Sequence, residues 1–221
     1  MDRPSATSQG REPNFERREH RGTRIGLLGG TFDPPHLGHL LVAHQIRLLL
    51  GLYEVRLVVA NEPWQKTAGR VITPAPVRLA MTRAAIKWAE AQGVEGLAAS
   101  DIELELGGSS FTAVTLDHLN ATEPDNDWSV IVGSDAAAGL LTWHEAARLK
   151  LLANFVVVDR AGVDAPPPPE GFSYQRVEAK TIDVSSSAVR SMVAKGLSPV
   201  LLVPPPVIAI VNEQGLYRPE S

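Results

Sequence analysis

Short runs of apolar, mostly β-branched residues recur along the chain, and stretches with helical spacing separate them. The runs have no polar face, which is typical of parallel strands that helices cover on both sides. The predicted strands are 25–29, 54–60, 129–133, 155–159 and 174–179. Because the strands alternate with helices through short connections, the pattern predicts an α/β fold with a doubly wound parallel sheet and helices on both faces.

The stretches between the runs carry the apolar spacing of helices. Residues 37–50 are nearly all apolar and end at Gly51, and residues 75–92 precede Gly93, a residue type favoured after a helix. The apolar stripe of the second helix consists of Val77, Met81, Ala84 and Trp88. Further helices are predicted at 110–119, 142–152 and 204–214. In a doubly wound sheet the ligand lies at the carboxyl ends of the strands, where the strand order reverses.

The composition is that of an ordinary globular protein, and it excludes some kinds of chemistry. Of the 221 residues, 44% are hydrophobic and 21% charged, and the formal net charge is −4. A weakly acidic chain gives no global reason to expect nucleic acid or a membrane surface as a partner. No cysteine is present, so disulfides, thiolate catalysis and cysteine metal sites are excluded. We expect a cytoplasmic protein.

The chain is predicted to contain a disordered leader and one domain. Residues 1–22 are polar and mixed in charge and have no apolar core of a signal peptide, and residues 23–221 form the expected domain. The apolar stretch 197–211 is interrupted by prolines and is too short to cross a bilayer. No membrane association is therefore expected.

The string GGTFDPPHLGHL, residues 29–40, directly follows the first predicted strand. Glycines there let the backbone approach a ligand, and the following helix offers unpaired N–H groups to an anion. His36 and His39 lie three residues apart, so both imidazoles can face the same ligand. A metal site would need a third ligand, which no nearby HExxH pattern or cysteine supplies. From this string alone, a plain turn with surface histidines is the alternative.

A second string, DVSSSAVR at residues 183–190, opens another predicted helix that Gly196 closes. Ser185 or Ser186 can cap this helix, and on its own the string is best explained as a capped helix. Arg190 lies about one turn inside the helix, so its side chain can point to the same ligand site as the N-terminus of this helix. An arginine suits a phosphate because its planar guanidinium pairs with two oxygens at once.

Together the two strings resemble the (H/T)xGH and ISSTxxR signatures of nucleotidyltransferases, with Val184 and Ser187 in place of Ile and Thr. The resemblance implies a Rossmann-like fold and transfer of a nucleoside monophosphate without a covalent intermediate. It implies that His39 supports the α-phosphate, that His36 binds phosphate in the transition state, and that Arg190 holds the leaving phosphates. The ATP-binding residues that we expect are Gly29, Gly30, Thr31, Phe32, His39, Gly133, Asp135, Ser186, Ser187 and Arg190.

Three further strings concern the acceptor: NEPWQK (61–66), GGSSFTAVTLDHL (107–119) and VIVGSDAAAGLLTWHEAARL (130–149). They are similar to segments of bacterial nicotinate mononucleotide adenylyltransferases, as is the ending GLYR (215–218). By this resemblance the acceptor is bound by Lys66, Thr112, Trp143 and His144, and Lys66 joins His36, His39 and Arg190 as a catalytic residue. Each string also has a plain interpretation, because Ser109 or Ser110 can cap a helix and Trp143 can belong to the core.

The resemblance covers roughly residues 24–218 and implies an adenylyltransferase that joins ATP and nicotinate mononucleotide into nicotinate adenine dinucleotide and pyrophosphate. It implies Mg²⁺ carried by ATP, with no metal site of the protein's own. The family often forms dimers, so a homo-oligomer is compatible with it. The alternatives are a phosphopantetheine adenylyltransferase, which shares both phosphate signatures, and a nucleotide-sensing regulator that has lost catalysis.

Overall fold

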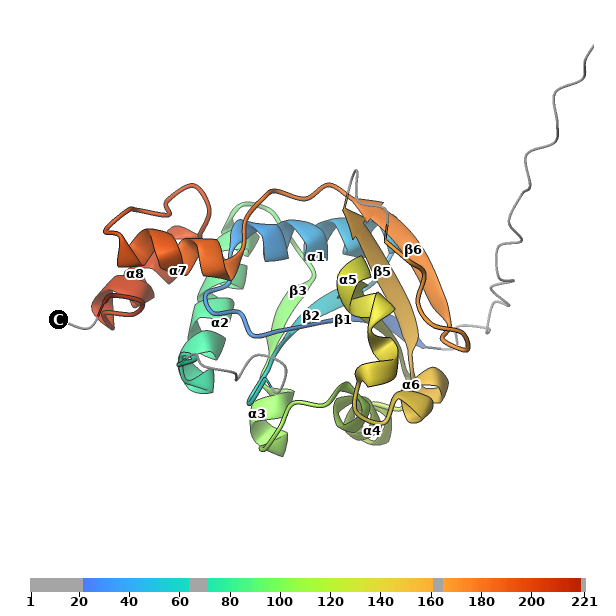
Figure 1. Ribbon diagram of the computed structural model, residues 1–221. Helices are drawn as coiled ribbons and strands as arrows, with labels where there is room; N and C mark the ends of the chain where they lie inside the picture. The colour runs from blue at the N-terminus through green and yellow to red at the C-terminus, as the bar shows by residue number, and fades with distance from the viewer. Residues whose placement is uncertain (1–21, 64–70, 161–164, 220–221) are drawn as a thin grey trace, which may run out of the picture.

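The computed structural model describes residues 22–63, 71–160 and 165–219. Within them six parallel strands form one sheet in the order β3-β2-β1-β4-β5-β6 (Figure 1). The strands are β1 Thr23–Gly30, β2 Glu54–Val59, β3 Leu97–Ser100, β4 Asn126–Gly133, β5 Asn154–Arg160 and β6 Tyr174–Ala179. The strand order reverses between β1 and β4, so the crevice expected for a ligand lies at their carboxyl ends. The doubly wound α/β fold is confirmed.

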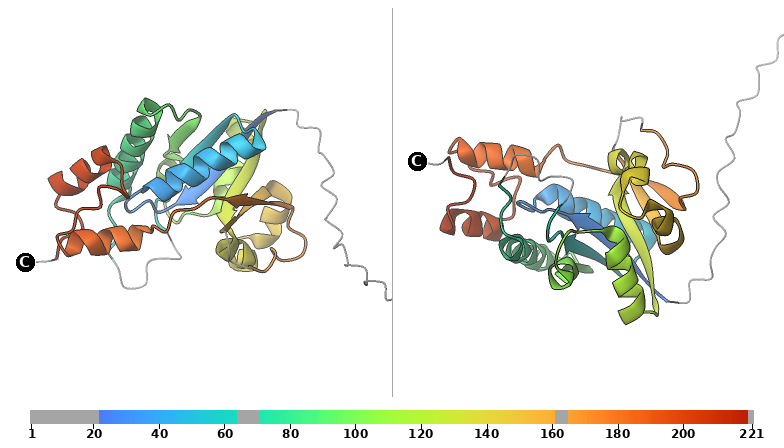
Figure 2. Two further views of the ribbon diagram at one scale, coloured as in Figure 1. Left: turned by 90° about the horizontal axis from the view of Figure 1, so that it is seen from above. Right: turned by 60° about the horizontal axis from the view of Figure 1, so that its bottom comes forward.

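Two layers of helices cover the sheet (Figures 1 and 2). One layer consists of α1 (Leu37–Leu50), α2 (Ala75–Ala91), α7 (Ser186–Ala194) and α8 (Pro205–Glu213). The other consists of α3 (Ile102–Leu106), α4 (Thr112–Thr122), α5 (Ser134–Ala138), the 3₁₀ turn η1 (Leu140–Thr142) and α6 (Ala146–Leu152). None of the helices described is long and apolar enough to cross a membrane.

β5 is apolar on both faces because each face packs against one helical layer, whereas the edge strand β6 exposes Gln175, Arg176 and Glu178. In β5, Phe155 and Val157 belong to the core under α4 and α6, whereas Val156 and Val158 belong to the core under α1. All four side chains are buried. Successive strand residues point to opposite faces, so a strand covered on both sides needs a continuous apolar run. This is the pattern that marks the strands in the sequence.

Several predicted elements have to be corrected. The sequence analysis missed β3 and α3, which follow α2. The helix predicted at 142–152 begins only at Ala146, because Glu145 adopts a left-handed backbone with φ of 52°. The helix predicted from residue 110 begins at Thr112 after an N-cap at Phe111, and neither Ser109 nor Ser110 caps it.

In α2 the buried face differs from the predicted stripe. It comprises Ala75, Arg78, Leu79, Met81, Thr82, Ala85, Ile86 and Ala89. Only Met81 of the predicted stripe is fully buried, and the other three residues flank the buried face. This shift brings an arginine, Arg78, into the interior.

Residues 1–21 of the predicted leader (1–22) lie outside the described residues, as do Trp64, Gln65 and Lys66 of the NEPWQK string. The assignments made for them stay predictions.

Candidate active site

A cleft of about 740 Å³ opens at the carboxyl ends of β1 and β4. Two segments about 150 residues apart in the chain meet around it: the loop from β1 into α1 and the start of α7. Of the predicted site residues, those that line the cleft are Gly29, Gly30, Thr31, Phe32, His36, His39, Gly133, Ser186, Ser187 and Arg190. The two phosphate-type strings therefore form one site.

His36 and His39 stack in the first turn of α1. Their ring centroids lie 3.6 Å apart with an interplanar angle of 21°, and the ring of Phe32 meets His39 edge-on at 4.9 Å. The backbone N–H of His36 donates to Nδ1 of His39 over 3.2 Å. Because Nδ1 of neutral His39 is the acceptor, its proton lies on Nε2. Local backbone contacts thus fix both the orientation and the tautomer of His39.

His36 is far more enclosed than its neighbour. Its side chain is only 6% exposed, and burial lowers its pKa from 6.5 to about 4. At pH 7 it is therefore a neutral imidazole and acts as a hydrogen-bond group rather than a cation. Its Nδ1 atom is buried and has no hydrogen-bond partner among the described residues.

Arg190 reaches from α7 to the β1–α1 loop. Its Nη1 atom donates to the backbone oxygen of Asp33 over 2.7 Å, and Nη2 donates to Oγ of Ser187 over 2.9 Å. Ser185, the N-cap, accepts a hydrogen bond from the N–H of Ala188 over 3.1 Å, and Ser186 Oγ donates to the oxygen of Pro34 over 2.8 Å. Of the two cap candidates, Ser185 is thus the one that caps α7.

The glycines of the first string have different functions. An added Cβ at Gly29 would meet no atom within 4 Å, so the backbone of β1 is open to the cleft there. A Cβ at Gly30 would lie 2.7 Å from the ring of Phe32, and one at Gly38 would lie 2.9 Å from Val184. Gly29 thus leaves room for a ligand, whereas Gly30 and Gly38 let protein segments pack closely around the site.

Three of the predicted acceptor residues are described by the structure: Thr112, Trp143 and His144. They lie on the α4 and α6 side of the sheet, and none of these three lines the cleft. The ring of Phe111, just before Thr112, stacks on His144 with centroids 4.0 Å apart. Asn61, at the start of the NEPWQK string, donates its N–H to Ser110 Oγ over 2.8 Å. The parts of all three acceptor strings that the structure describes therefore adjoin.

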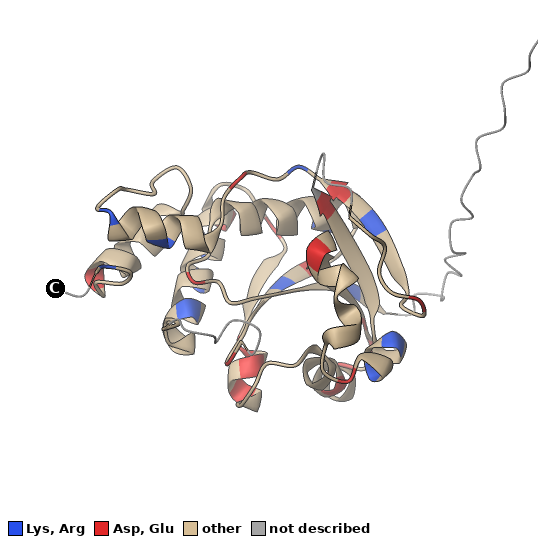
Figure 3. Ribbon diagram, in the orientation of Figure 1, with Lys and Arg blue, Asp and Glu red and all other residues tan. Residues whose placement is uncertain are grey.

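Two predicted residues have mixed surroundings. Trp143 is half-buried and meets Phe155 edge-on at 6.5 Å, so part of its ring belongs to the core. Asp135 is exposed in the first turn of α5, which is red in Figure 3, and it adjoins the cleft through Gly133 rather than lining it.

In the described part of the chain no three His, Cys, Asp or Glu residues group in a way that could hold a metal ion.

Three residues that shape the site were not found from the sequence. Asp33 is 1% exposed and accepts a hydrogen bond from the hydroxyl of Tyr217 over 2.7 Å. Arg78, also 1% exposed, donates to the backbone oxygens of Thr31, Asn61 and Thr73. The GLYR string contains Tyr217, but the pattern assigned it no contact. An arginine on the apolar side of α2 was a usable signal for Arg78.

Known proteins resemble this chain along most of its length. The sequence model of the cytidylyltransferase-like family matches residues 27–192. A protein of Saccharopolyspora erythraea described as a probable nicotinate-nucleotide adenylyltransferase is 36% identical over 203 residues, which are 91% of this chain and 92% of that protein. A protein of Streptococcus pyogenes serotype M1 with the same description is 38% identical over 92% of both chains.

A solved structure shares the fold. The nicotinic acid mononucleotide adenylyltransferase of Plasmodium falciparum, complexed with NaAD, superposes with a TM-score of 0.72 at 20% identity, and the match covers 88% of this chain and 97% of that one.

Proposed function

This chain belongs to the cytidylyltransferase-like family and, within it, to the nicotinate-nucleotide adenylyltransferases, and from that premise we propose how its cleft works. The reaction joins ATP and nicotinate mononucleotide into nicotinate adenine dinucleotide and releases pyrophosphate. One observation carries the proposal: the β1–α1 loop and the start of α7 surround a single cleft at the point where the strand order reverses. Two phosphate-binding segments around one cleft suit a polyphosphate substrate.

The chemical step needs alignment and charge stabilisation rather than a nucleophile of the protein. The 5′-phosphate oxygen of the mononucleotide forms a bond to the α-phosphorus of ATP in line with the bond to the β-phosphate oxygen, which breaks. The electron pair leaves with pyrophosphate. Groups that donate to the phosphate oxygens and hold both substrates supply most of the acceleration in such transfers.

The donor side of the cleft supplies these groups. His39 would donate from Nε2 to the α-phosphate, and His36, neutral at pH 7, would donate a hydrogen bond from its imidazole rather than a positive charge. Arg190 would pair with the β- and γ-phosphates together with Ser187 and the N–H groups at the start of α7. Mg²⁺ would arrive with ATP, held by phosphate oxygens and water.

The acceptor would lie against α4 and the Trp143–His144 turn. Thr112 is the first residue of α4, where its hydroxyl and the free N–H groups of the first turn suit the carboxylate of the pyridine ring. The exposed side of Trp143 would stack on that ring, and His144 would meet the carboxylate through its backbone N–H. Lys66 stays a proposed phosphate ligand from outside the described residues.

The test is pyrophosphate release from Mg²⁺–ATP with nicotinate mononucleotide, nicotinamide mononucleotide and phosphopantetheine in parallel assays. We expect the highest kcat/KM with nicotinate mononucleotide and no release with phosphopantetheine. Release with phosphopantetheine alone would identify the related adenylyltransferase instead. If ATP binds but no acceptor releases pyrophosphate, the protein is a nucleotide sensor and the proposal is wrong.

A further inference from the structure

The β1–α1 loop is buried and held in a strained conformation. Thr31, Phe32, Asp33 and His36 are each less than a tenth exposed, and Phe32 has a φ of 49°. A bulky residue in the left-handed region costs free energy, so the surrounding structure must hold it there. Loops that carry such strain are found at functional sites, where the strained conformation places a reactive group.

A contact from the far end of the chain holds this loop. Tyr217 follows α8, and its hydroxyl donates to Oδ1 of Asp33 over 2.7 Å across 184 residues of sequence. Tyr217 is itself left-handed, with φ of 62°, after the left-handed Gly215. Burial is the main cause that raises the pKa of the Tyr217 phenol well above its usual range, so the hydroxyl keeps its proton and stays a donor at working pH.

Asp33 connects this contact to a phosphate-binding side chain. While its carboxylate accepts from Tyr217, its backbone oxygen accepts from Nη1 of Arg190 over 2.7 Å. Tyr217 and Arg190 therefore lie on two sides of the same residue. A movement of Asp33 would shift the carbonyl that orients the guanidinium of Arg190.

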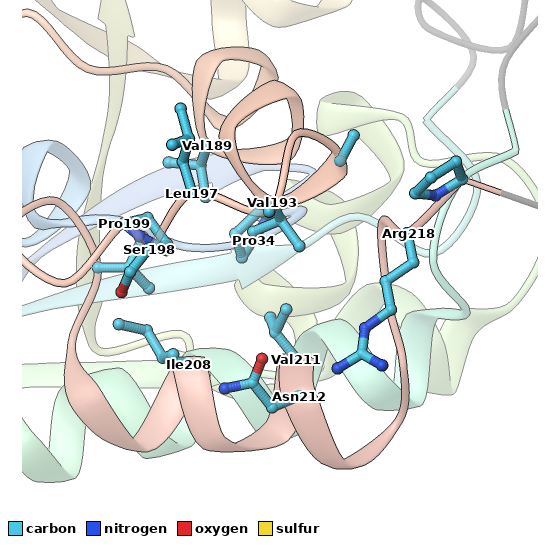
Figure 4. Close-up of a pocket in the computed structure, with 14 residues that line it drawn as sticks. Pro34, Val189, Val193, Leu197, Ser198, Pro199, Ile208, Val211, Asn212 and Arg218 are labelled. Atoms are coloured by element: carbon cyan, nitrogen blue, oxygen red, sulfur yellow. The ribbon is translucent and has the colours of Figure 1, made fainter.

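Tyr217 and Leu216, in the turn after α8, pack against the same core cluster as Phe32 of the loop. A groove of about 570 Å³ lies between α7 and α8. Figure 4 shows Pro34 among the residues that line it, together with Val189, Val211 and Arg218. A polar contact also connects the turn after α8 to the loop. The hydrogen bond from Tyr217 to Asp33 makes this connection.

We propose that Tyr217 is a positioning residue of the active site: by holding Asp33 it fixes the β1–α1 loop and, through the Asp33 carbonyl, the guanidinium of Arg190. Tyr217 is not among the described residues that line the cleft, and its hydroxyl donates to Asp33, so its effect on the site is assigned to Asp33. The inference rests on the proposed adenylyl transfer and adds to it a function for the C-terminal segment.

The experiment compares Tyr217→Phe with Tyr53→Phe in the full chain. Both variants remove one phenolic hydroxyl, but Tyr53 is 70% exposed in the turn before β2. Misplacement of a phosphate-binding group lowers turnover by about 10-fold to 100-fold, so we expect that loss of kcat for Tyr217→Phe and no change for Tyr53→Phe. The KM for nicotinate mononucleotide should stay within about twofold of wild type, because Arg190, which Asp33 orients, belongs to the proposed ATP side of the cleft.

A double-mutant cycle with Arg190→Ala separates positioning from simple stabilisation. If Tyr217 acts through Arg190, Tyr217→Phe lowers kcat in the wild-type background but not further in Arg190→Ala. Equal losses in the two backgrounds, or unchanged kcat in Tyr217→Phe, would overturn the inference. An inactive wild-type protein would instead contradict the proposed function.

Variants of Asp33 keep the test decisive if Tyr217→Phe folds poorly. The amide oxygen of Asp33→Asn can still accept from Tyr217, whereas Asp33→Ala leaves the hydroxyl without this acceptor. We expect Asp33→Asn to keep kcat within about threefold and Asp33→Ala to lose about 10-fold or more. Equal kcat values for the two variants would contradict the inference.

Discussion

Two histidines three positions apart have different surroundings, and the difference assigns them different chemistry. His39 lies at the cleft with its Nδ1 held by the backbone of His36, so Nε2 is its donor. His36 is buried and neutral at pH 7. Their spacing predicted that both can face one ligand, and the resemblance to the (H/T)xGH signature implied that both bind phosphate. Their charge depends on burial by residues distant in sequence, which spacing does not encode.

We predict that His39→Ala lowers kcat by about 10²–10³-fold, since removal of one preorganised donor to a transition-state oxyanion has that effect. The free energy of unfolding should change little, because His39 is only half-buried. Steady-state pyrophosphate release and urea unfolding measure the two effects. His118→Ala, at an exposed position of α4, is the control. Near-normal turnover of His39→Ala would remove His39 from the catalytic residues.

The burial of His36 predicts that the protein loses stability in mild acid. The unfolded chain binds a proton at this residue below about pH 6.5, whereas the folded protein resists protonation until about pH 4. The free energy of unfolding therefore falls as the pH drops from about 6.5 to about 4, and His36 does not affect it at higher pH. Between pH 7 and pH 5 the expected contribution is about 2 kcal/mol.

Urea unfolding of wild type and His36→Asn at pH 7 and pH 5 measures this contribution. The variant should lose less free energy of unfolding over that interval than wild type. The carboxylates titrate in both proteins and cancel in the comparison. Equal losses in the two proteins would show that His36 titrates alike in the folded and unfolded chains.

At the scale of elements, most strands and helices were predicted from the sequence, because the apolar residues of each element have the spacing that its packing requires. It missed β3, LAAS, because this strand is short and lacks β-branched residues, and α3, IELEL, because five residues do not show a helical period. It started a helix at residue 142, whereas the structure turns at Glu145, stacks His144 on Phe111 and begins α6 at Ala146. Tertiary contacts override local propensity there.

Arg78 of α2 binds two loops of the site, the loop between β1 and α1 and the loop between β2 and α2. Its guanidinium donates to Thr73, Thr31 and Asn61, which lie before α2, after β1 and after β2. We predict that Arg78→Met lowers the free energy of unfolding by about 3 kcal/mol or more, because it leaves buried carbonyl oxygens without their donors.

Arg83→Met is the matched control on the same helix. Arg83 is 57% exposed at its side chain and pairs with Asp101 over 2.6 Å, a surface pair whose removal should cost less than about 1 kcal/mol. Urea unfolding of both variants measures the difference. Equal losses for Arg78→Met and Arg83→Met would mean that the buried guanidinium does not hold the loops.

At the scale of the whole molecule, the fold class and the donor cleft could be predicted from the sequence, and the contacts between distant segments could not. Both phosphate strings start helices at the same edge of a parallel sheet, so the alternation of elements brings them together. The bond between Asp33 and Tyr217 spans 184 residues and leaves no local pattern. Such contacts depend on how α8 packs, which periodicity does not fix.

The proposed site places the two substrates on either side of this edge of the sheet, so a substitution on one side should affect one substrate. Ser187 lies at the cleft with Arg190, whereas Thr112 begins α4 beside the Phe111–His144 stack. We predict that Thr112→Ala raises the KM for nicotinate mononucleotide about fivefold to tenfold and leaves that for ATP within twofold, as expected for one lost hydrogen bond. Ser187→Ala should do the reverse.

These two substitutions are sharper probes than Trp143→Ala, because Trp143 also packs on Phe155 and its loss would disturb the core. Initial rates at varied concentrations of each substrate give both KM values for each variant. Opposite selectivity in the two variants means that donor and acceptor are bound by different halves of the molecule and meet only where the phosphates react. Parallel changes in both KM values would place Thr112 outside the acceptor site.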